Sequence, residues 1–190
     1  MNKKQEIYDE AAKLFQEKGY GAASMRDLAE RVHLKASSLY SHIRKKEEIL
    51  EKICADLAVW FTEAMERVEE MEATPREKVR ELLSFHIRTA MDDPTSITVF
   101  SDEWKHLEEP YRSQFLASRR DYEERFRRII QAGVSKGEFR PIDPNIILYT
   151  LLSGIRWLHH KQRLPIPQHR EGLEMQVIEL LLEGLSKKNQ

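Results

Sequence analysis

The stretch of sequence that decides the fold reads SMRDLAERVHLKASSLYSHIRKKEEIL and covers residues 24–50. Its apolar residues follow helical spacing in two short runs, residues 25–32 and 36–42, with a tight turn between them. A longer helical run begins at about Lys46. Two short helices joined by a tight turn form a helix-turn-helix, whose second helix can lie in the major groove of DNA. The segment therefore predicts a DNA-binding head near the N-terminus.

The second helix of this motif, residues 36–42, has two chemically different faces. Ala36 and Ile43 lie within about 60° of Leu39 on a helical projection, so these three residues predict the buried stripe. The candidates for reading bases face away from this stripe, and they are Lys35, Ser37, Ser38, Tyr40 and Ser41. Phosphate binding needs side-chain donors at helix ends where backbone N–H groups and the helix dipole already favour an anion. The candidates for phosphate contacts are Arg26, Tyr40, His42, Arg44 and Lys46. Taken alone, the basic run could equally be a solvated turn.

Helical spacing continues along the rest of the chain, with no strand-like alternation and no internal repeat. A first helix over residues 3–18 precedes the motif, and Gly19 is placed to end it. After a long helix over residues 46–71, polar residues followed by proline open helices near residues 75–91, 94–104, 110–137 and 144–160, and a last helix ends near Leu185. The sequence predicts an all-α protein of nine helices, with a three-helix head in residues 1–46 and a helical body in residues 47–190.

The composition fits a soluble, helix-rich globular protein, with 41 % hydrophobic and 33 % charged residues among 190. No apolar run approaches the roughly 18 residues that a membrane span needs. The start, MNKKQEIYDE, is too polar for a secretory signal. The single cysteine, Cys54, excludes an internal disulfide and a cysteine metal cluster. We therefore expect a cytoplasmic protein with no membrane partner.

Charge is distributed unevenly along the chain, although the net charge is only −1. Residues 1–46 contain ten Lys and Arg against six Asp and Glu, whereas residues 47–190 contain 21 against 26. A basic head on an acidic body is expected if only the head meets phosphate. The distribution agrees with DNA binding by the head.

The body contains apolar and aromatic residues that are candidates for an effector pocket. Ligand sites in helical bundles are apolar cavities with a few placed polar groups. The candidates are Phe61, Met65, Phe85, His86, Trp104, Tyr122, Phe126, Tyr149 and Trp157. Each of them alone fits an ordinary core position, and His86 could be either a polar anchor for the effector or a hydrogen-bonded core histidine. The body is therefore predicted to bind an unidentified, largely apolar small molecule.

One pair of residues has the spacing of metal ligands. Glu103 and His106 are three residues apart, as in the helical bundles that hold two iron ions. Such sites need a second copy of the pair and two further carboxylates, and the sequence has no second copy. We interpret the pair as a chance occurrence and predict no metal and no cofactor. No paired nucleophile and base is evident either, so the sequence does not predict an enzyme.

The last two long helices are predicted to form a homodimer surface. Apolar residues surround nearly the whole of the helix over residues 144–160. The last helix has two apolar stripes, one containing Leu180 and the other Ile178. Two stripes let a helix face its own core and a partner at once, although burial inside a monomer is the alternative. Twofold symmetry would place two heads on DNA half-sites about one turn or more apart.

The N-terminal motif resembles the head of the TetR family of bacterial transcriptional repressors. The residues at the positions that correspond to the family pattern are Ser24, Asp27, Leu28, Ala29, Leu39, Tyr40, Ile43, Lys46, Glu47, Glu48 and Ile49, preceded by Ala11, Ala12, Leu14, Phe15, Gly19 and Tyr20. The chain departs from the pattern at His33 and Ser37, where glycine is usual, at Ile43, where an aromatic residue is usual, and at Lys45, which replaces a small helix cap. The resemblance implies a DNA-binding repressor that leaves its double-stranded operator when a small-molecule effector binds the body.

A helical module that binds other proteins through the head is the alternative function. The two functions differ in their response to salt. Affinity for DNA phosphates should fall steeply and linearly on a log–log plot as salt rises. A flat response would favour the protein-binding module.

Overall fold

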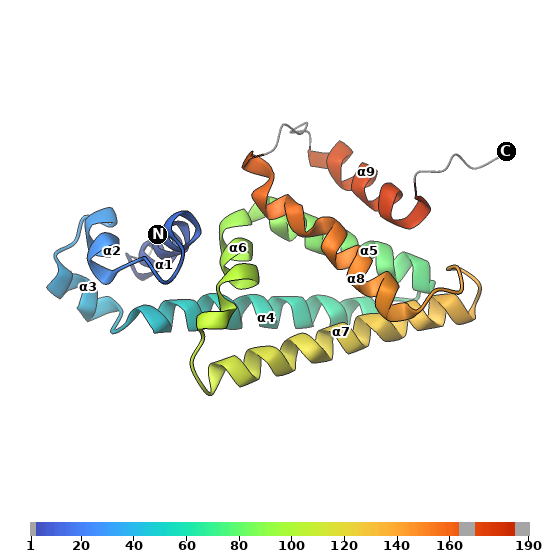
Figure 1. The fold of residues 1–190 in the computed structure, drawn as a ribbon, viewed down its shortest axis with the longest axis horizontal. Coiled ribbons are helices and arrows are strands. Elements are labelled where there is room, and N and C mark those ends of the chain that lie inside the picture. Colours follow the sequence, from blue (N-terminus) through green and yellow to red (C-terminus); the bar gives the residue numbers. More distant parts are fainter. Residues whose placement is uncertain (1–2, 164–169, 185–190) are drawn as a thin grey trace. The chain divides into compact units, whose positions relative to one another are not determined.

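The computed structural model describes residues 3–163 and 170–184, and the secondary structure of these residues is helical without a β-strand (Figure 1). The predicted all-α class is confirmed. The helices are α1 (Lys3–Lys18), α2 (Met25–Arg31), α3 (Ala36–His42), α4 (Lys46–Glu70), α5 (Pro75–Asp92), α6 (Pro94–Asp102), α7 (Tyr111–Ser135), α8 (Pro144–Ile155) and α9 (Arg170–Glu183), with 3-10 segments η1 (Trp104–His106) and η2 (Arg156–Arg163). Within the described ranges, no helix is long and apolar enough to cross a membrane.

Packing divides the chain into two compact units. Unit 1 comprises Met1–Trp60 and Thr95–Arg119, and unit 2 comprises Phe61–Pro94 and Arg120–Gln190. Both α4 and α7 begin in unit 1 and end in unit 2. These units follow packing and do not coincide with the head and body of residues 1–46 and 47–190, so that functional division stays a prediction.

The first two helices of unit 1 form as their sequence signals predict. The inward face of α1 is buried through Ile7, Ala11, Leu14 and Phe15. Gly19 follows α1 with a φ of 79°, in the left-handed region that glycine adopts without steric cost. Ser24 caps α2, because its hydroxyl accepts the backbone N–H of Asp27 at 3.1 Å and the Asp27 carboxylate accepts the Ser24 N–H at 2.9 Å.

The turn between α2 and α3 contains a residue in the left-handed region. His33 has a φ of 54°, at the position where glycine was expected from the family pattern. The turn closes through the N–H of Leu34, which donates to the carbonyl of Ala29 at 2.9 Å. The motif therefore keeps its geometry at a backbone cost of about 1 kcal/mol for a non-glycine residue in this region.

Packing of α3 against α2 rests on fewer residues than the helical projection predicts. Leu39 and Ile43 are fully buried, whereas Ala36 is exposed. Ala36 is the first residue of a seven-residue helix, so its methyl group lies at the helix end. The predicted three-residue stripe is thus wrong at Ala36 and right at the other two positions.

Unit 2 is built around α5, which contacts α8, α9 and η2. Figure 1 shows α5, α8 and α9 beside one another. The core residues that these helices contribute are Val79, Leu82, Leu83 and Ile87 from α5, Leu148, Leu151 and Ile155 from α8, and Val177 and Ile178 from α9. Thr74 and Glu77 form a capping box at the start of α5, and Pro75 occupies its first turn, as the sequence predicts.

The end of α8 differs from the prediction. The α-helix stops at Ile155 and continues as the 3-10 segment η2, whereas spacing predicted an α-helix to about residue 160. The indole N–H of Trp157 donates to the carbonyl of Gly154 at 2.7 Å. In a continuing α-helix that carbonyl would accept from the backbone N–H of residue 158, so the indole competes for the bond. The predicted end of the last helix, Leu185, lies outside the described residues.

Candidate nucleic-acid interface and effector site

The outward face of α3 is accessible over its whole length. Its serines are exposed, and Tyr40 keeps 50 % of its surface exposed. Ser41 donates its hydroxyl to the carbonyl of Ser38 at 2.7 Å, which leaves the oxygen of Ser41 free to accept from another donor. The candidate base-reading residues Lys35, Ser37, Ser38, Tyr40 and Ser41 are thus exposed together on one short helix and its first flank. A helix with this surface can enter a groove.

Basic residues flank α3 on both sides. Lys35 precedes the helix and Arg44 follows it, and both are exposed, as is His42 at the last helical position. Arg26, at the start of α2, is paired with Glu30 at 3.3 Å, yet 88 % of its side chain is exposed. An exposed pair of this kind contributes little, so the guanidinium can exchange its partner for a phosphate. Other cations of unit 1, such as Lys18 with Asp27, are held in ion pairs.

Lys46 is placed differently from the other candidate phosphate ligands. Its ammonium group donates to the carbonyls of Tyr20 at 2.8 Å and Ala23 at 2.9 Å. It also lies 4.2 Å from the centroid of the Tyr20 ring, within reach of a cation–π interaction. Because two of its three N–H donors are engaged, Lys46 fastens the start of α4 to the loop after α1.

Tyr20 is a positioning residue that the candidate set lacks. Its buried ring stacks on His106 of η1 with centroids 5.2 Å apart, and its hydroxyl donates to Glu47 at 3.3 Å. Burial and the nearby Glu47 carboxylate raise the pKa of Tyr20 well above its ordinary value. Tyr20 therefore connects the loop after α1 to both α4 and η1. In the sequence, the pair Gly19–Tyr20 signals the end of α1, but it gives no indication that Tyr20 contacts Glu47 and His106.

An aromatic cluster in unit 2 brings together five of the candidate effector residues. The ring of Phe61 on α4 lies 4.8 Å from His86 and 5.4 Å from Phe85, both on α5. Tyr122 on α7 is 5.8 Å from Phe61, and Phe126 is 6.3 Å from Tyr122, between ring centroids. Three helices thus converge on one apolar site.

The cluster contains a single polar pair. The Nε2 atom of His86 and the hydroxyl of Tyr122 are 2.8 Å apart and share a hydrogen bond. Burial lowers the pKa of His86 to about 4 and raises the pKa of Tyr122, so both groups are neutral at physiological pH. Both side chains retain some accessible surface. The arrangement can orient a ligand by one hydrogen bond while its apolar part contacts the rings.

The remaining candidate pocket residues lie elsewhere or contribute only packing. Met65 on α4 is fully buried, and Trp157 donates its indole N–H within the α8–η2 junction. Tyr149 is 51 % exposed and donates to Glu123 at 3.2 Å. Trp104 belongs to unit 1, where it stacks on Phe115 with centroids 5.6 Å apart. The structure therefore does not gather the whole candidate set in one place.

The pair with metal-ligand spacing is engaged within unit 1. The Nε2 atom of His106 lies 3.4 Å from a carboxylate oxygen of Glu103, and the His106 ring also stacks on Tyr20. Among the described residues, no group of three or more His, Cys, Asp or Glu side chains could hold a metal ion.

Two family models match the chain. Residues 7–53 match the model described as "Bacterial regulatory proteins, tetR family". Residues 72–185 match the model described as "Tetracyclin repressor-like, C-terminal domain". The first match contains α2 and α3, and the second contains α5 and the candidate effector residues of α5 and α7.

Individual proteins are similar over nearly the whole chain. The HTH-type transcriptional repressor KstR2 of Mycolicibacterium smegmatis is 23 % identical over 188 residues, which cover 98 % of this chain and 92 % of that protein. The structure of the TetR family transcriptional regulator PfmR from Thermus thermophilus has a TM-score of 0.80 and 32 % identity, and the match covers 95 % of this chain and 99 % of that chain. AibR in complex with isovaleryl coenzyme A and operator DNA shares the fold, with a TM-score of 0.82, 22 % identity and coverage of 95 % and 98 %.

Proposed function

The chain belongs to the TetR family of bacterial regulatory proteins, and from this premise we propose that it is a repressor that reads its operator with α3. The observation that carries the proposal is the exposed polar face of α3, which opposes the buried Leu39 and Ile43. Ser37, Tyr40 and the other outward side chains of α3 would contact base edges, and the flanking cations would contact phosphates. A protein that regulates transcription in a bacterium acts in the cytoplasm.

We propose that a largely apolar effector binds at the aromatic cluster around Phe61 and His86. The rings would cover the apolar part of the effector, and the His86–Tyr122 pair would orient one polar group. AibR is a relative in fold that binds isovaleryl coenzyme A, so an acyl group is an effector chemistry that suits this cluster. The role proposed for the cluster is regulatory, and no catalytic role is assigned to it.

The release mechanism that we propose is a population shift. The helix α4 carries Lys46, fastened to the loop after α1, and also Phe61, which belongs to the aromatic cluster. An effector that binds preferentially when α4 is tilted would favour a form whose heads are wrongly spaced for the operator. For this shift the effector must bind the tilted form more tightly than the untilted form. The difference in affinity would come from contacts with the ring of Phe61, which moves with α4.

The functional form that we propose is a homodimer through α8 and α9, which contact each other in unit 2. Large apolar side chains on these two helices are exposed: Ile146 at 60 %, Tyr149 at 51 %, Met175 at 56 % and Leu180 at 48 %. Clustered exposed apolar groups are typical of protein interfaces. A twofold axis at this surface would give each operator half-site its own α3.

Replacement of Tyr40 tests the proposed DNA-reading face. With a duplex selected by the wild-type protein from a random library, we expect Tyr40→Ala to weaken binding at least about tenfold, the loss of one good contact. Tyr111→Ala is the matched control, because Tyr111 is 43 % exposed and lies outside the motif, and its affinity should stay within about twofold of wild type. Fluorescence anisotropy measures both. An unchanged affinity for Tyr40→Ala would refute this docking face.

The alternative, a head that binds proteins instead of DNA, is tested with the same selected duplex. Binding to phosphate should weaken linearly in log–log form as salt rises, with a slope near −0.9 for each phosphate contacted. Failure of the wild-type protein to select any duplex, or a flat salt response, would favour the alternative.

A further inference from the structure

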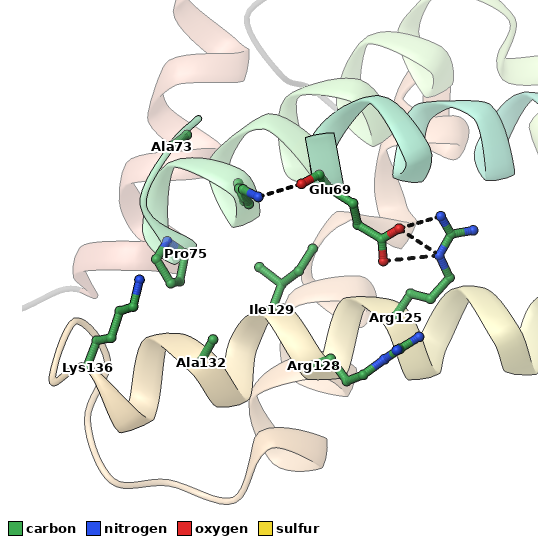
Figure 2. A pocket seen from close by; sticks show the side chains of 9 residues that line it. Glu69, Ala73, Pro75, Arg125, Arg128, Ile129, Ala132 and Lys136 are labelled. Carbon is green, nitrogen blue, oxygen red and sulfur yellow. Dashed lines mark hydrogen bonds and ion pairs between the residues drawn. The ribbon is translucent and has the colours of Figure 1, made fainter. Parts of the chain in front are cut away.

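Unit 2 contains a hollow that is separate from the aromatic cluster. It has a volume of about 290 Å³ and lies where the end of α4, the start of α5 and the second half of α7 meet (Figure 2). None of its lining residues belongs to the aromatic cluster. Its volume is at the lower end of the range of roughly 300–1,000 Å³ found for small-molecule sites.

The hollow is lined by more positive than negative charge. Its only carboxylate, Glu69, accepts from the guanidinium of Arg125 at two oxygens, with the Arg125 Nε atom 3.1 Å from each. This pair leaves three cations, Lys78, Arg128 and Lys136, and within the described part of the chain none of the three forms an ion pair within 4 Å. Lys78 instead donates to the backbone carbonyl of Glu69 at 2.7 Å.

The field of these cations reaches into the hollow. Hydrogen bonding from Arg125 is the main cause that lowers the pKa of Glu69, and the charges of Arg128 and Lys78 lower it further. A concave site with charges of one sign concentrates counter-ions. Figure 2 shows Arg128 extending along α7 toward Arg125, and Lys136 pointing toward Pro75.

The floor of the hollow is apolar. Ile129 and Ala132 face it from α7, opposite Pro75 and Ala73 from the segment that opens α5 (Figure 2). Positions 125, 128, 129 and 132 are three or four residues apart or adjacent, so they share one face of α7, and Lys136 lies in the turn directly after the helix. An apolar floor with a cationic rim suits a ligand that has an apolar part and a negatively charged group.

We propose that this hollow binds the phosphate group of a small organic phosphate, with the apolar floor covering the group to which the phosphate is attached. Three uncompensated cations from α5, α7 and the turn after α7 match the two negative charges and three free oxygens of a phosphate monoester better than the single charge of a carboxylate. Arg128 would donate from α7, Lys136 from the turn that follows α7, and Lys78 from α5. The site is separate from the proposed effector cluster and from α3.

Isothermal titration calorimetry on the full chain tests the proposal with three probes: hexyl phosphate, inorganic phosphate and hexanoate. We expect saturable binding of hexyl phosphate, weaker binding of inorganic phosphate, and no displacement of bound hexyl phosphate by an equal concentration of hexanoate, because hexanoate lacks the phosphate and would bind at the separate aromatic cluster. Equal affinities for hexyl phosphate and inorganic phosphate would identify free phosphate as the ligand and overturn the role of the apolar floor. Displacement of hexyl phosphate by an equal concentration of hexanoate, or no binding of either phosphate at millimolar concentration, would overturn the proposal.

Charge variants locate the site. Arg128→Gln with Lys136→Gln should weaken hexyl phosphate binding at least about tenfold, since two charge-assisted hydrogen bonds are lost. The matched control is Arg67→Gln with Arg80→Gln, which removes the same charge from exposed residues outside the lining. The control should stay within about twofold of wild type. An equal loss in both double variants would show non-specific attraction and refute the site. All four replaced side chains are exposed, so circular dichroism should show unchanged folding.

Discussion

At the scale of single residues, the ammonium group of Lys46 fixes the start of α4 to the loop after α1. Two carbonyls and the Tyr20 ring surround it, and hydrogen bonds from a charged donor stabilise a fold more than bonds between neutral groups. The place of Lys46 at a helix start, where an anion is favoured, predicts a contact with phosphate. The internal partners of Lys46 could not be predicted, because they are backbone oxygens more than twenty residues away in the sequence.

We expect Lys46→Met to lower the free energy of unfolding by about 2 kcal/mol, because two hydrogen bonds from a charged donor and a cation–π contact are lost. Urea unfolding followed by circular dichroism measures the change. Lys45→Met is the matched control: Lys45 is half-exposed, and its nearest carboxylate, Glu51, is 3.6 Å away. The control should lose less than about 0.5 kcal/mol. Similar losses in both variants would contradict the anchoring role of Lys46.

At the scale of elements, the sequence predicts a helix boundary well where a cap or a proline defines it. The boundaries of α1 and α5 match their predictions within about a residue, because Gly19 and the Thr74–Pro75 pair act through local backbone chemistry. The predicted end of α8 was wrong. There the Gly154 carbonyl accepts from the indole N–H of Trp157, and a side-chain bond of this kind is not signalled by a cap or a proline.

The candidate site shows the same limit of local signals. Phe61, His86 and Tyr122 were predicted as pocket residues from their type, and the structure brings them together. Trp104 has the same chemistry but packs in unit 1, because the path of the chain after α6 takes it there. The basic hollow was not predicted, since its cations come from α5 and from α7 with the turn after it, which are far apart in the sequence.

A close approach at the end of α7 gives a prediction for that element. A Cβ atom at Gly133 would lie 2.4 Å from the Phe139 ring and 3.2 Å from Pro75. We expect Gly133→Ala to lower the free energy of unfolding by about 1–2 kcal/mol, because overpacking exceeds the gain in helix propensity. Gly172→Ala in α9 is the control, because its Cβ would meet only the Gln176 amide nitrogen at 3.8 Å. Its stability in urea unfolding should rise by about 0.5–1 kcal/mol. Equal changes in both variants would contradict the close packing of Phe139 on α7.

At the scale of the whole molecule, the proposed regulator needs two copies of α3 that are held at a fixed separation. In the proposed homodimer, the exposed apolar side chains of α8 and α9 would supply the surface for this, and Ile146 and Met175 are the most exposed of those named. Burial of such groups against a symmetric copy is favourable by about 25 cal/mol for each Å² of apolar surface. The oligomeric state is therefore expected to depend on this pair of helices.

We expect Ile146→Glu to convert the proposed dimer to a monomer, because each copy would bury a carboxylate in an apolar interface. Sedimentation equilibrium measures the mass of the species in solution. Val59→Glu is the matched control, since Val59 is similarly exposed at 57 % but lies on α4. The control should remain dimeric. A dimer that persists with Ile146→Glu, or a wild-type protein that is monomeric at micromolar concentration, would refute this interface.

The serine-rich face of α3 has a consequence for the genome that this protein reads. A hydroxyl group rotates to donate or to accept, so in the proposed docking Ser37 and Ser38 could each satisfy several bases, whereas Ser41, which donates to the Ser38 carbonyl, could accept from any base that offers a donor. The selectivity of the protein for its operator would then depend less on the base sequence within each half-site than on the distance between the two half-sites. One inserted base pair rotates one half by about 35° relative to the other, and two rigidly joined readers cannot follow that rotation.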